Sequence, residues 1–395
     1  MHIPRGFKFA GVHAGIKRNP AKEDVTLIVA DQPAVAAGVY TQNLVYAAPV
    51  AYDRERTPSD QIRCVVVNSG NANACTGERG LNDAREMARL AAATCGANAD
   101  QALVMSTGII GEFLPMEKIA AGITACAGKL ADDEAAYQSA ARGILTTDKG
   151  VKAVSRSVQV AGQEIRLAGM AKGAGMIGPR MATLLGVLLT DANLTVADAQ
   201  SALSDAIADS FNCISVEGHM STNDTVLLLA SGAAGGAPLA GADLEAFRKA
   251  LKETAIELAK MIPDDGEGAT HLMVIDVVGA KTRDDAHRIA QTIADSALVK
   301  TAIHGGDPNW GRIVSAAGYA GVPFNPAGVG LTVNDYPLYA NGAPVKFDAA
   351  TVSQSMQSNR ETHIVLSLSE GDAKVRFWSS DLTVEYVKFN ADYHT

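Results

Sequence analysis

The chain has 395 residues, more than one hydrophobic core usually covers, so its length predicts two or three packed units. Apolar residues make up 47% and charged residues 19% of the sequence, which excludes a disordered chain and is typical of a soluble α/β or α+β enzyme. The net charge of -9 comes without a block of basic residues, which argues against nucleic acid or anionic lipid and favours a small-molecule partner.

The cysteines and the N-terminal segment bear on the cellular compartment. The five cysteines are scattered without a C-x-x-C pair, so neither a zinc site nor a disulfide framework is predicted, and a reducing compartment is expected. The N-terminal segment lacks the apolar region of a signal peptide, and no stretch reaches the roughly 20 apolar residues of a membrane span. We therefore expect a cytoplasmic protein. An organellar precursor stays open, because a transit peptide can be missing from the sequence.

Strand, loop and helix patterns alternate in the first third of the chain. Residues 62–68 form an apolar, β-branched run that predicts a strand, and a second apolar run follows at 102–105. Each run leads into a polar, glycine-rich loop and then into a helical stretch, at 81–94 and 116–129.

A predicted hairpin at 158–167, turning at Gly162, precedes the least usual segment of the sequence. Four glycines lie between Gly169 and Gly178, and a strand-like apolar run extends from Leu184 to Leu189. The later elements are predicted as helices at 196–212 and 243–261 and as strands at 272–278, 363–368 and 382–389.

Thr183 stands at the start of this apolar run, after a glycine-rich approach. Taken alone, such a threonine is most simply a buried strand residue. The whole string GMAKGAGMIGPRMAT, however, resembles the self-processing segment of the ornithine acetyltransferase family, also called bifunctional glutamate N-acetyltransferases, whose precursors cleave themselves between Ala and Thr. The resemblance implies cleavage between Ala182 and Thr183. It divides the chain into an α chain, residues 1–182, and a β chain, residues 183–395.

Further blocks resemble the family along the whole chain and in family order. They are NSGNANACTG at 68–77, STGIIG at 106–111, TTD at 146–148, STNDT at 221–225, DGEGATH at 265–271, GGDPNWGRI at 305–313 and the C-terminal NADYHT. The resemblance implies an α/β (α+β) fold in which mixed sheets are sandwiched between helices and the two chains interlock. It also implies oligomerisation as an α2β2 heterotetramer.

A threonine at a cleavage junction has a chemical purpose. Its hydroxyl can attack the preceding carbonyl, and cleavage then frees an α-amine with a reference pKa of roughly 7.7, which can take the proton from the Thr183 hydroxyl. No histidine is needed, in agreement with the eight histidines, which form no evident Ser-His-Asp arrangement. His271 and His304 are expected to be structural.

Acyl transfer also requires hydrogen-bond donors for the oxyanion of the tetrahedral intermediate. By resemblance, the side-chain hydroxyl of Thr107 and the backbone N–H of Gly108 supply them, and glycine allows the close approach that such a turn needs. The alternative is an ordinary strand-to-helix turn in which Ser106 or Thr107 is the N-cap.

The resemblance also implies a set of substrate-binding residues: Thr146, Lys172, Thr183, Glu267, Asn390 and Thr395. Lys172, expected in a flexible glycine loop, can hold a carboxylate or lower the pKa of the Thr183 amine; the alternative is a solvated loop lysine. Glu267 can accept a hydrogen bond from a side-chain amine of the substrate; the alternative is a surface turn. The C-terminal residues, including Asn390 and Thr395, are expected to close the site rather than to fray.

Two segments depart from the family pattern. The block usually written SVDGDTSTND reads SVEGHMSTND here, so Glu217, His219 and Met220 replace shorter or hydroxyl-bearing residues, and Arg180 stands where Asn is usual. If the first loop reaches the pocket, His219 adds a contact that titrates near neutral pH. A packing change without effect on the site is the alternative.

The expected reaction is a ping-pong transfer. The Thr183 hydroxyl takes the acetyl group of N-acetylornithine, and the amine of glutamate then takes it from the acetyl-enzyme. No metal or bound cofactor is expected, and whether acetyl-CoA serves as a second donor stays open. The alternatives are an amidase or aminopeptidase with the same N-terminal nucleophile, and a non-catalytic binding protein. The intact residues Thr107, Gly108, Lys172, Thr183 and Glu267 argue against the last.

Overall fold

The computed structural model describes residues 1–160, 162–178 and 184–392. The described strands are β1 (Phe7–Val12), β2 (Val25–Tyr40), β3 (Ser59–Asn71), β4 (Ala102–Ile109), β5 (Lys152–Val160), β6 (Gln163–Lys172), β7 (Leu185–Thr190), β8 (Ile214–Ser215), β9 (Thr225–Ala230), β10 (Leu272–Ala280), β11 (Gly330–Val333), β12 (Tyr336–Ala340), β13 (Ala343–Pro344), β14 (Glu361–Ser367) and β15 (Ala373–Ser380). The described α-helices are α1 (Ala48–Arg54), α2 (Gly77–Ala93), α3 (Met116–Ala127), α4 (Glu134–Gly143), α5 (Val196–Ala208), α6 (Gly241–Asp264), α7 (Arg283–Asp295), α8 (Ala297–His304), α9 (Trp310–Gly318), α10 (Ala349–Ser358) and α11 (Val384–Asp392).

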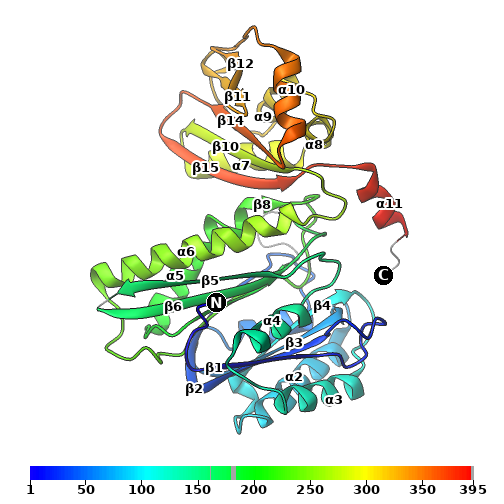
Figure 1. Ribbon diagram of the computed structural model, residues 1–395, viewed down its shortest axis with the longest axis vertical. Coiled ribbons are helices and arrows are strands. Elements are labelled where there is room, and N and C mark those ends of the chain that lie inside the picture. The colour runs from blue at the N-terminus through cyan, green and yellow to red at the C-terminus, as the bar shows by residue number, and fades with distance from the viewer. Residues whose placement is uncertain (161, 179–183, 393–395) are drawn as a thin grey trace.

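These strands form two mixed sheets (Figure 1). The eight-stranded sheet has the order β4-β3-β2-β9-β7-β6-β5, with β1 paired to β2. Its β3–β4 and β7–β9 pairs are parallel and its other pairs are antiparallel. The seven-stranded sheet has the order β13-β12-β11-β14-β10-β15-β8, and it also mixes both directions. The expected α/β class with mixed sheets is confirmed.

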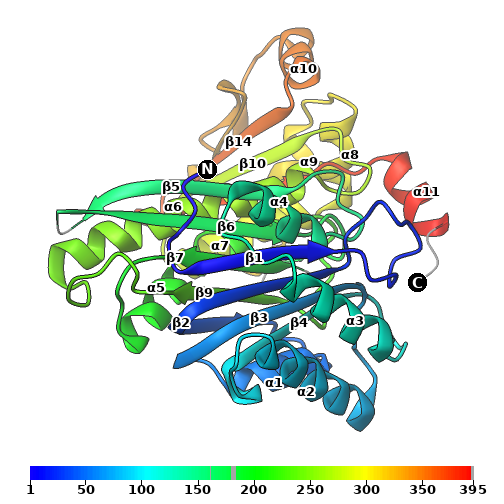
Figure 2. The ribbon, with the colours of Figure 1, turned by 60° about the horizontal axis from the view of Figure 1, so that its bottom comes forward.

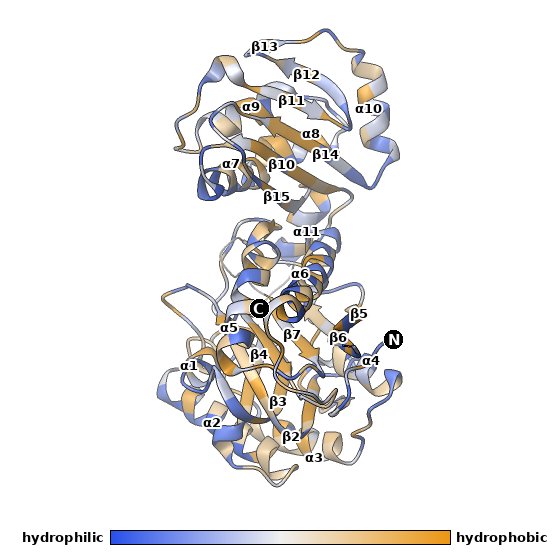
Figure 3. Ribbon diagram, turned by 90° about the vertical axis from the view of Figure 1, so that its left-hand side faces the viewer, coloured by the Kyte–Doolittle hydropathy of each residue, from blue (hydrophilic) through white to orange (hydrophobic). Residues whose placement is uncertain are grey.

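Helices cover the sheets and seal the core. The two views of the ribbon show α2 and α3 along one side of the larger sheet (Figures 1 and 2), where they bury a cluster with β2, β3 and β4. Helix α6 packs on β5 and β6 and also on β8 and β15, so it lies between the two sheets. The strands carry the most apolar stretches of the chain (Figure 3), as the burial of their side chains requires.

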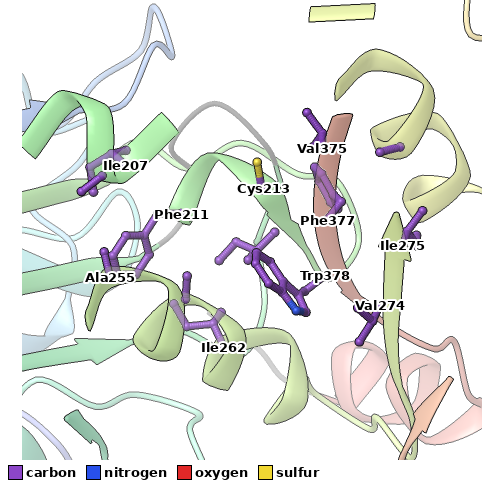
Figure 4. Packing of buried hydrophobic residues seen from close by; sticks show 14 of the residues in the cluster. Ile207, Phe211, Cys213, Ala255, Ile262, Val274, Ile275, Val375, Phe377 and Trp378 are labelled. Atoms are coloured by element: carbon purple, nitrogen blue, oxygen red, sulfur yellow. The ribbon is translucent and has the colours of Figure 1, made fainter. Parts of the chain in front are cut away.

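A single buried cluster joins the two sheets through α6. Phe211 and Ile262 face Trp378 across this contact, and all three belong to one hydrophobic cluster (Figure 4). The burial of such aromatic and aliphatic side chains is the main favourable contribution to packing here. The described residues include no helix that is long and apolar enough to cross a membrane.

Most of the predicted elements are confirmed. The predicted hairpin is the β5–β6 pair, in which Val160 lies opposite Gln163 and Gly162 has a φ of +74°, a backbone angle that favours glycine. The predicted strand at 382–389 is wrong, because residues 384–389 belong to α11. The alternation of apolar and polar residues indicated a strand. A helix starts here instead, because the Thr383 hydroxyl accepts a hydrogen bond from the backbone N–H of Tyr386.

Strands from both sides of the Ala182–Thr183 junction share the larger sheet. Strands β7 and β9, which follow residue 183, lie between β2 and β6, which precede it. Backbone hydrogen bonds of the two halves therefore depend on each other, and neither half completes this sheet alone.

Candidate active site

A cavity of about 280 Å³ opens at one end of the larger sheet, where β4 and β6 end and β7 and β9 begin. Its lining residues are Ala72, Thr107, Gly108, Ile110, Thr146, Thr147, Lys172, Gly175, Met176, Ser221, Thr222, Asn223, Glu267 and Asn390. The structure therefore brings together six predicted site residues from five separate parts of the chain. Ala182, Thr183 and Thr395 lie outside the described residues, as does Arg180.

The residue that follows Thr183 is held beside this cavity. The backbone N–H of Leu184 donates to Oδ1 of Asp224 (2.8 Å), and the Leu184 carbonyl accepts from the N–H of Thr225 (3.2 Å). Burial raises the pKa of Asp224 well above its usual range, against the opposing effects of the Leu184 amide and Lys172. Sequence reasoning missed this role of Asp224, although the residue lies in the recognised STNDT block.

The end of β4 has the close approach that the Thr107-Gly108 pair requires. Gly108 has a φ of +134°, and a Cβ there would lie 2.3 Å from the carbonyl carbon of Gly70, so only glycine fits. The side-chain amide of Asn223 donates to the carbonyls of Ser106 (2.8 Å) and Ala72 (2.6 Å), which fixes this turn against the STNDT loop.

The helix-cap alternative for Ser106 and Thr107 is wrong, because both residues lie within β4. Helix α3 begins only at Met116, and Pro115 is its N-cap. The Ser106 hydroxyl instead donates to Oδ1 of Asn68 (2.6 Å) in the neighbouring strand. Asn68 thus acts as a scaffold for the turn, the role that asparagine-rich loops commonly have.

Lys172 differs from its expected environment. It is the last residue of β6 and is buried, not a residue of a flexible loop. Burial lowers the pKa of its ammonium group, while the nearby carboxylates of Asp148, Asp224 and Glu267 act in the opposite direction. The solvated-lysine alternative is therefore wrong. A buried ammonium at the wall of this cavity suits the binding of a carboxylate.

Asp148 organises the charges around Lys172. Its Oδ1 accepts from Lys152 Nζ (2.7 Å) and from the backbone N–H of Gly173 (2.7 Å), and Lys152 Nζ also donates to Asp265 (2.6 Å). Burial by itself would raise the pKa of the Asp148 carboxyl, but Lys172, Lys152 and the Gly173 amide outweigh it and hold the pKa below its usual range. Asp148 is ionised in the folded protein. Of the TTD block at 146–148, the sequence had predicted only Thr146 as a site residue.

Glu267 lines the cavity. Its Oε1 accepts from the Thr147 hydroxyl (2.7 Å), and its Oε2 accepts from the side-chain amide of Asn390 (3.1 Å). A Cβ on Gly175 would come within 2.4 Å of this carboxylate, so the glycine leaves room for it. Glu267 lies in a turn, as the alternative has it, but this turn lines the cavity. Asn390, on the C-terminal helix, lines the cavity as well.

The residues that differ from the family pattern lie next to the site without lining it. Glu217, His219 and Met220 are absent from the cavity wall, whereas Ser221, Thr222 and Asn223 belong to it. The backbone N–H groups of Val216, Glu217 and Gly218 all point to the carbonyl of Ile177, on the segment that leads to the cleavage junction. The loop therefore supports this segment from behind.

Comparisons with known proteins identify the family of this chain. A family model described as "ArgJ family" matches residues 8–395. The arginine biosynthesis bifunctional protein ArgJ of Rhodopirellula baltica is 48% identical over 100% of this chain and 96% of its own length. The protein of the same name from Symbiobacterium thermophilum is 45% identical over 99% of this chain and 98% of its own.

A solved structure of an ArgJ protein also matches this chain. The crystal structure of arginine biosynthesis bifunctional protein argJ from Bacillus halodurans is 37% identical and matches with a TM-score of 0.51, covering 52% of this chain and 98% of that one. The family model and both relatives span practically the whole sequence. The chain therefore belongs to the ArgJ family.

Proposed function

We propose that this protein is an acetyltransferase of arginine biosynthesis that moves the acetyl group of N-acetylornithine to glutamate. Membership of the ArgJ family supports the activity, since relatives that match the whole chain carry arginine biosynthesis in their names. The observation that carries the proposal is the convergence of Thr107, Gly108, Lys172 and Glu267 on one cavity beside Leu184.

In the proposed mechanism Thr183 is the nucleophile. Its α-amine, freed by cleavage after Ala182, takes the proton of the hydroxyl as it attacks the acetyl carbonyl. The Thr107 hydroxyl and the Gly108 N–H stabilise the oxyanion. Ornithine leaves with the proton, and the amine of glutamate then attacks the acetyl ester and restores the hydroxyl.

The charges of the cavity support substrates with an α-carboxylate and an amine. Lys172, a buried cation, is proposed to hold the carboxylate, with Thr146 beside it. Glu267 is proposed to receive the side-chain ammonium of ornithine, and Asn390 and Thr395 to close the site over it. No resident cofactor or metal is assigned to this chemistry, and assembly as an α2β2 heterotetramer remains part of the proposal.

The test is a mass spectrum of the purified protein before and after mixing with N-acetylornithine alone. We expect two fragments that divide between Ala182 and Thr183, and an added acetyl group on Thr183 that disappears when glutamate is supplied. Thr183→Ala should stay uncut and inactive. A protein that stays whole, or that transfers acetyl groups without an acetylated fragment, contradicts the mechanism.

The same experiment separates the other readings. An amidase or aminopeptidase would release acetate or free amino acid without glutamate, and the family relatives do not favour it. Acetyl-CoA is offered in a parallel reaction as the only acetyl donor. Formation of N-acetylglutamate there assigns the second donor, and its absence leaves N-acetylornithine as the donor.

A further inference from the structure

Two histidines outside the cavity converge on one buried carboxylate. His271 directly precedes β10, His304 ends α8, and Asp381 directly follows β15, so three distant parts of the chain meet here. His271 Nδ1 lies 3.3 Å and His304 Nδ1 lies 3.2 Å from Oδ2 of Asp381. None of these residues lines the cavity, and acetyl transfer as proposed uses none of them.

The spacing of these atoms fits a tetrahedral metal ion. Two ligands at about 2.0–2.1 Å from zinc, at the tetrahedral angle, lie roughly 3.3 Å apart. Both nitrogen-to-oxygen distances match this value, and the three candidate ligand atoms lie within 4.8 Å of one another. Imidazole nitrogen with one carboxylate oxygen is a donor set that suits zinc and similar first-row ions, not magnesium or calcium.

The surroundings orient the carboxylate in the way that a ligand needs. The other oxygen of Asp381, Oδ1, accepts from the backbone N–H of Thr270 (2.9 Å), and the Thr270 hydroxyl donates to Oδ2 (2.5 Å). The Asp381 side chain is fully buried, whereas that of His304 is 41% exposed. One ligand is thus fixed from inside, and solvent reaches the site from the His304 side.

We propose that His271, His304 and Asp381 form a binding site for one divalent transition-metal ion, with zinc as the expected occupant and water as a further ligand. The ion ties the 265–271 loop, which carries Glu267, to the start of the tail that carries Asn390. The Thr383 hydroxyl already joins these two segments by donating to the Gly268 carbonyl (2.8 Å). The ion has a structural role, because it holds together the two segments that carry Glu267 and Asn390.

The experiment is a titration of the full-length protein with zinc by calorimetry after removal of metals with a chelator. We expect one equivalent to bind per chain. Cobalt should give the visible absorption of a tetrahedral site without a thiolate charge-transfer band. Zinc should raise the unfolding temperature of the parent protein, because a ligand that binds only the folded state stabilises it.

The deciding variant is His304→Gln, which removes a metal ligand from a partly exposed position and keeps a hydrogen-bonding side chain. Zinc affinity should fall by more than about 100-fold, since even loss of an outer-shell partner typically costs 10–100-fold. His271→Gln should behave alike. His363→Gln is the matched control, because His363 also faces a carboxylate, that of Asp276 at 2.8 Å, and its loss should leave binding unchanged.

Two results would overturn the proposal: a parent protein that binds no stoichiometric zinc, or a His304→Gln variant that binds zinc as tightly as the parent. In either case the cluster is a hydrogen-bond network among the two imidazoles, the Thr270 hydroxyl and the Asp381 carboxylate. Binding is measured without substrate. The outcome therefore does not depend on the acetyltransferase mechanism.

Discussion

The two walls of the cavity are built in opposite ways. On the sheet side, Lys172 and its partners Asp148 and Lys152 are buried in a network of charges anchored on β5 and β6. On the other side, Asn390 stands on α11, a helix without a buried residue. Glu267 touches both walls, through Thr147 and through Asn390. The comparison teaches that the charged groups are held by a fixed frame, while the tail adds a contact that is easily lost.

The largest effect is expected from a substitution in the buried charge network on the sheet side of the cavity. Asp148→Asn removes the carboxylate that interacts most strongly with the buried ammonium of Lys172, while Lys152 keeps Asp265. Leaving a buried charge uncompensated typically destabilises a protein by about 3–5 kcal/mol. Urea unfolding measures it. Glu86→Gln is the control, because Glu86 pairs with Arg89 on the exposed face of α2 and should cost about 0–1 kcal/mol. An equal decrease of the free energy of unfolding in both variants would contradict the view that the buried charge network is a fixed frame.

The second effect concerns the turn at the end of β4. Gly108→Ala places a Cβ 2.3 Å from the Gly70 carbonyl carbon, so the turn must shift, and acetyl transfer should fall by about 10²–10³ as the proposed oxyanion donor moves. Gly111→Ala is the control: its φ is also positive, at +86°, but its Cβ meets nothing within 4 Å. Full activity of Gly108→Ala would remove Gly108 from the proposed machinery.

The third prediction concerns Glu217, which lies near both Glu267 and α11. Burial raises the pKa of Glu217 from 4.5 to about 8, helped by Glu267 and opposed by Lys300, and neither carboxyl oxygen has a hydrogen-bond partner. An acid with a raised folded-state pKa contributes stability below the unfolded value and loses it as the pH rises through the folded one. Stability should therefore fall between about pH 4.5 and about pH 8.

Denaturant midpoints measured across this pH range test the prediction. Glu217→Gln, which cannot ionise, should flatten the slope and leave the variant more stable than the parent at pH 9. His219→Ala, at an exposed position of the same loop, is the control and should keep the parent's slope. An unchanged slope in Glu217→Gln would mean that another group carries the pH dependence.

The smallest effect is expected on the side of the cavity that α11 provides. Asn390→Ala removes one hydrogen bond to Glu267, which typically contributes about 0.5–1.5 kcal/mol, so KM for N-acetylornithine should rise several-fold with little change in kcat. Steady-state kinetics measures both. Lys388→Ala removes an exposed side chain paired with Glu385 on the same helix and should change neither value. A large loss of kcat in Asn390→Ala would mean that the tail takes part in the chemistry.

The order of the elements was predictable because each has a strong local signal. The apolar β-branched runs that became β3, β4 and β10 and the amphipathic α5 and α6 follow from side-chain periodicity alone. The site residues Thr107, Lys172 and Glu267 were found through recognised blocks, and periodicity alone would have left them as turn or loop residues. The helix at 384–392 was missed, because its alternating apolar residues obscured the hydroxyl cap of Thr383.

The sequence by itself determined which residues are proposed to carry the chemistry, since hydroxyl, ammonium and carboxylate groups stand in short motifs whose order can be read directly. Only the tertiary structure decided their surroundings. The burial of Lys172 and the contacts of Asp148 and Asp224 arise where β4, β6, β7 and β9 end or begin at one end of the larger sheet. His271, His304 and Asp381 meet at the smaller sheet, where β10 begins and β15 and α8 end. Desolvation and charge coupling depend mostly on distances between segments far apart in the chain, such as 25 residues for Asp148 and Gly173 and 40 for Leu184 and Asp224, which no local pattern in a single sequence encodes.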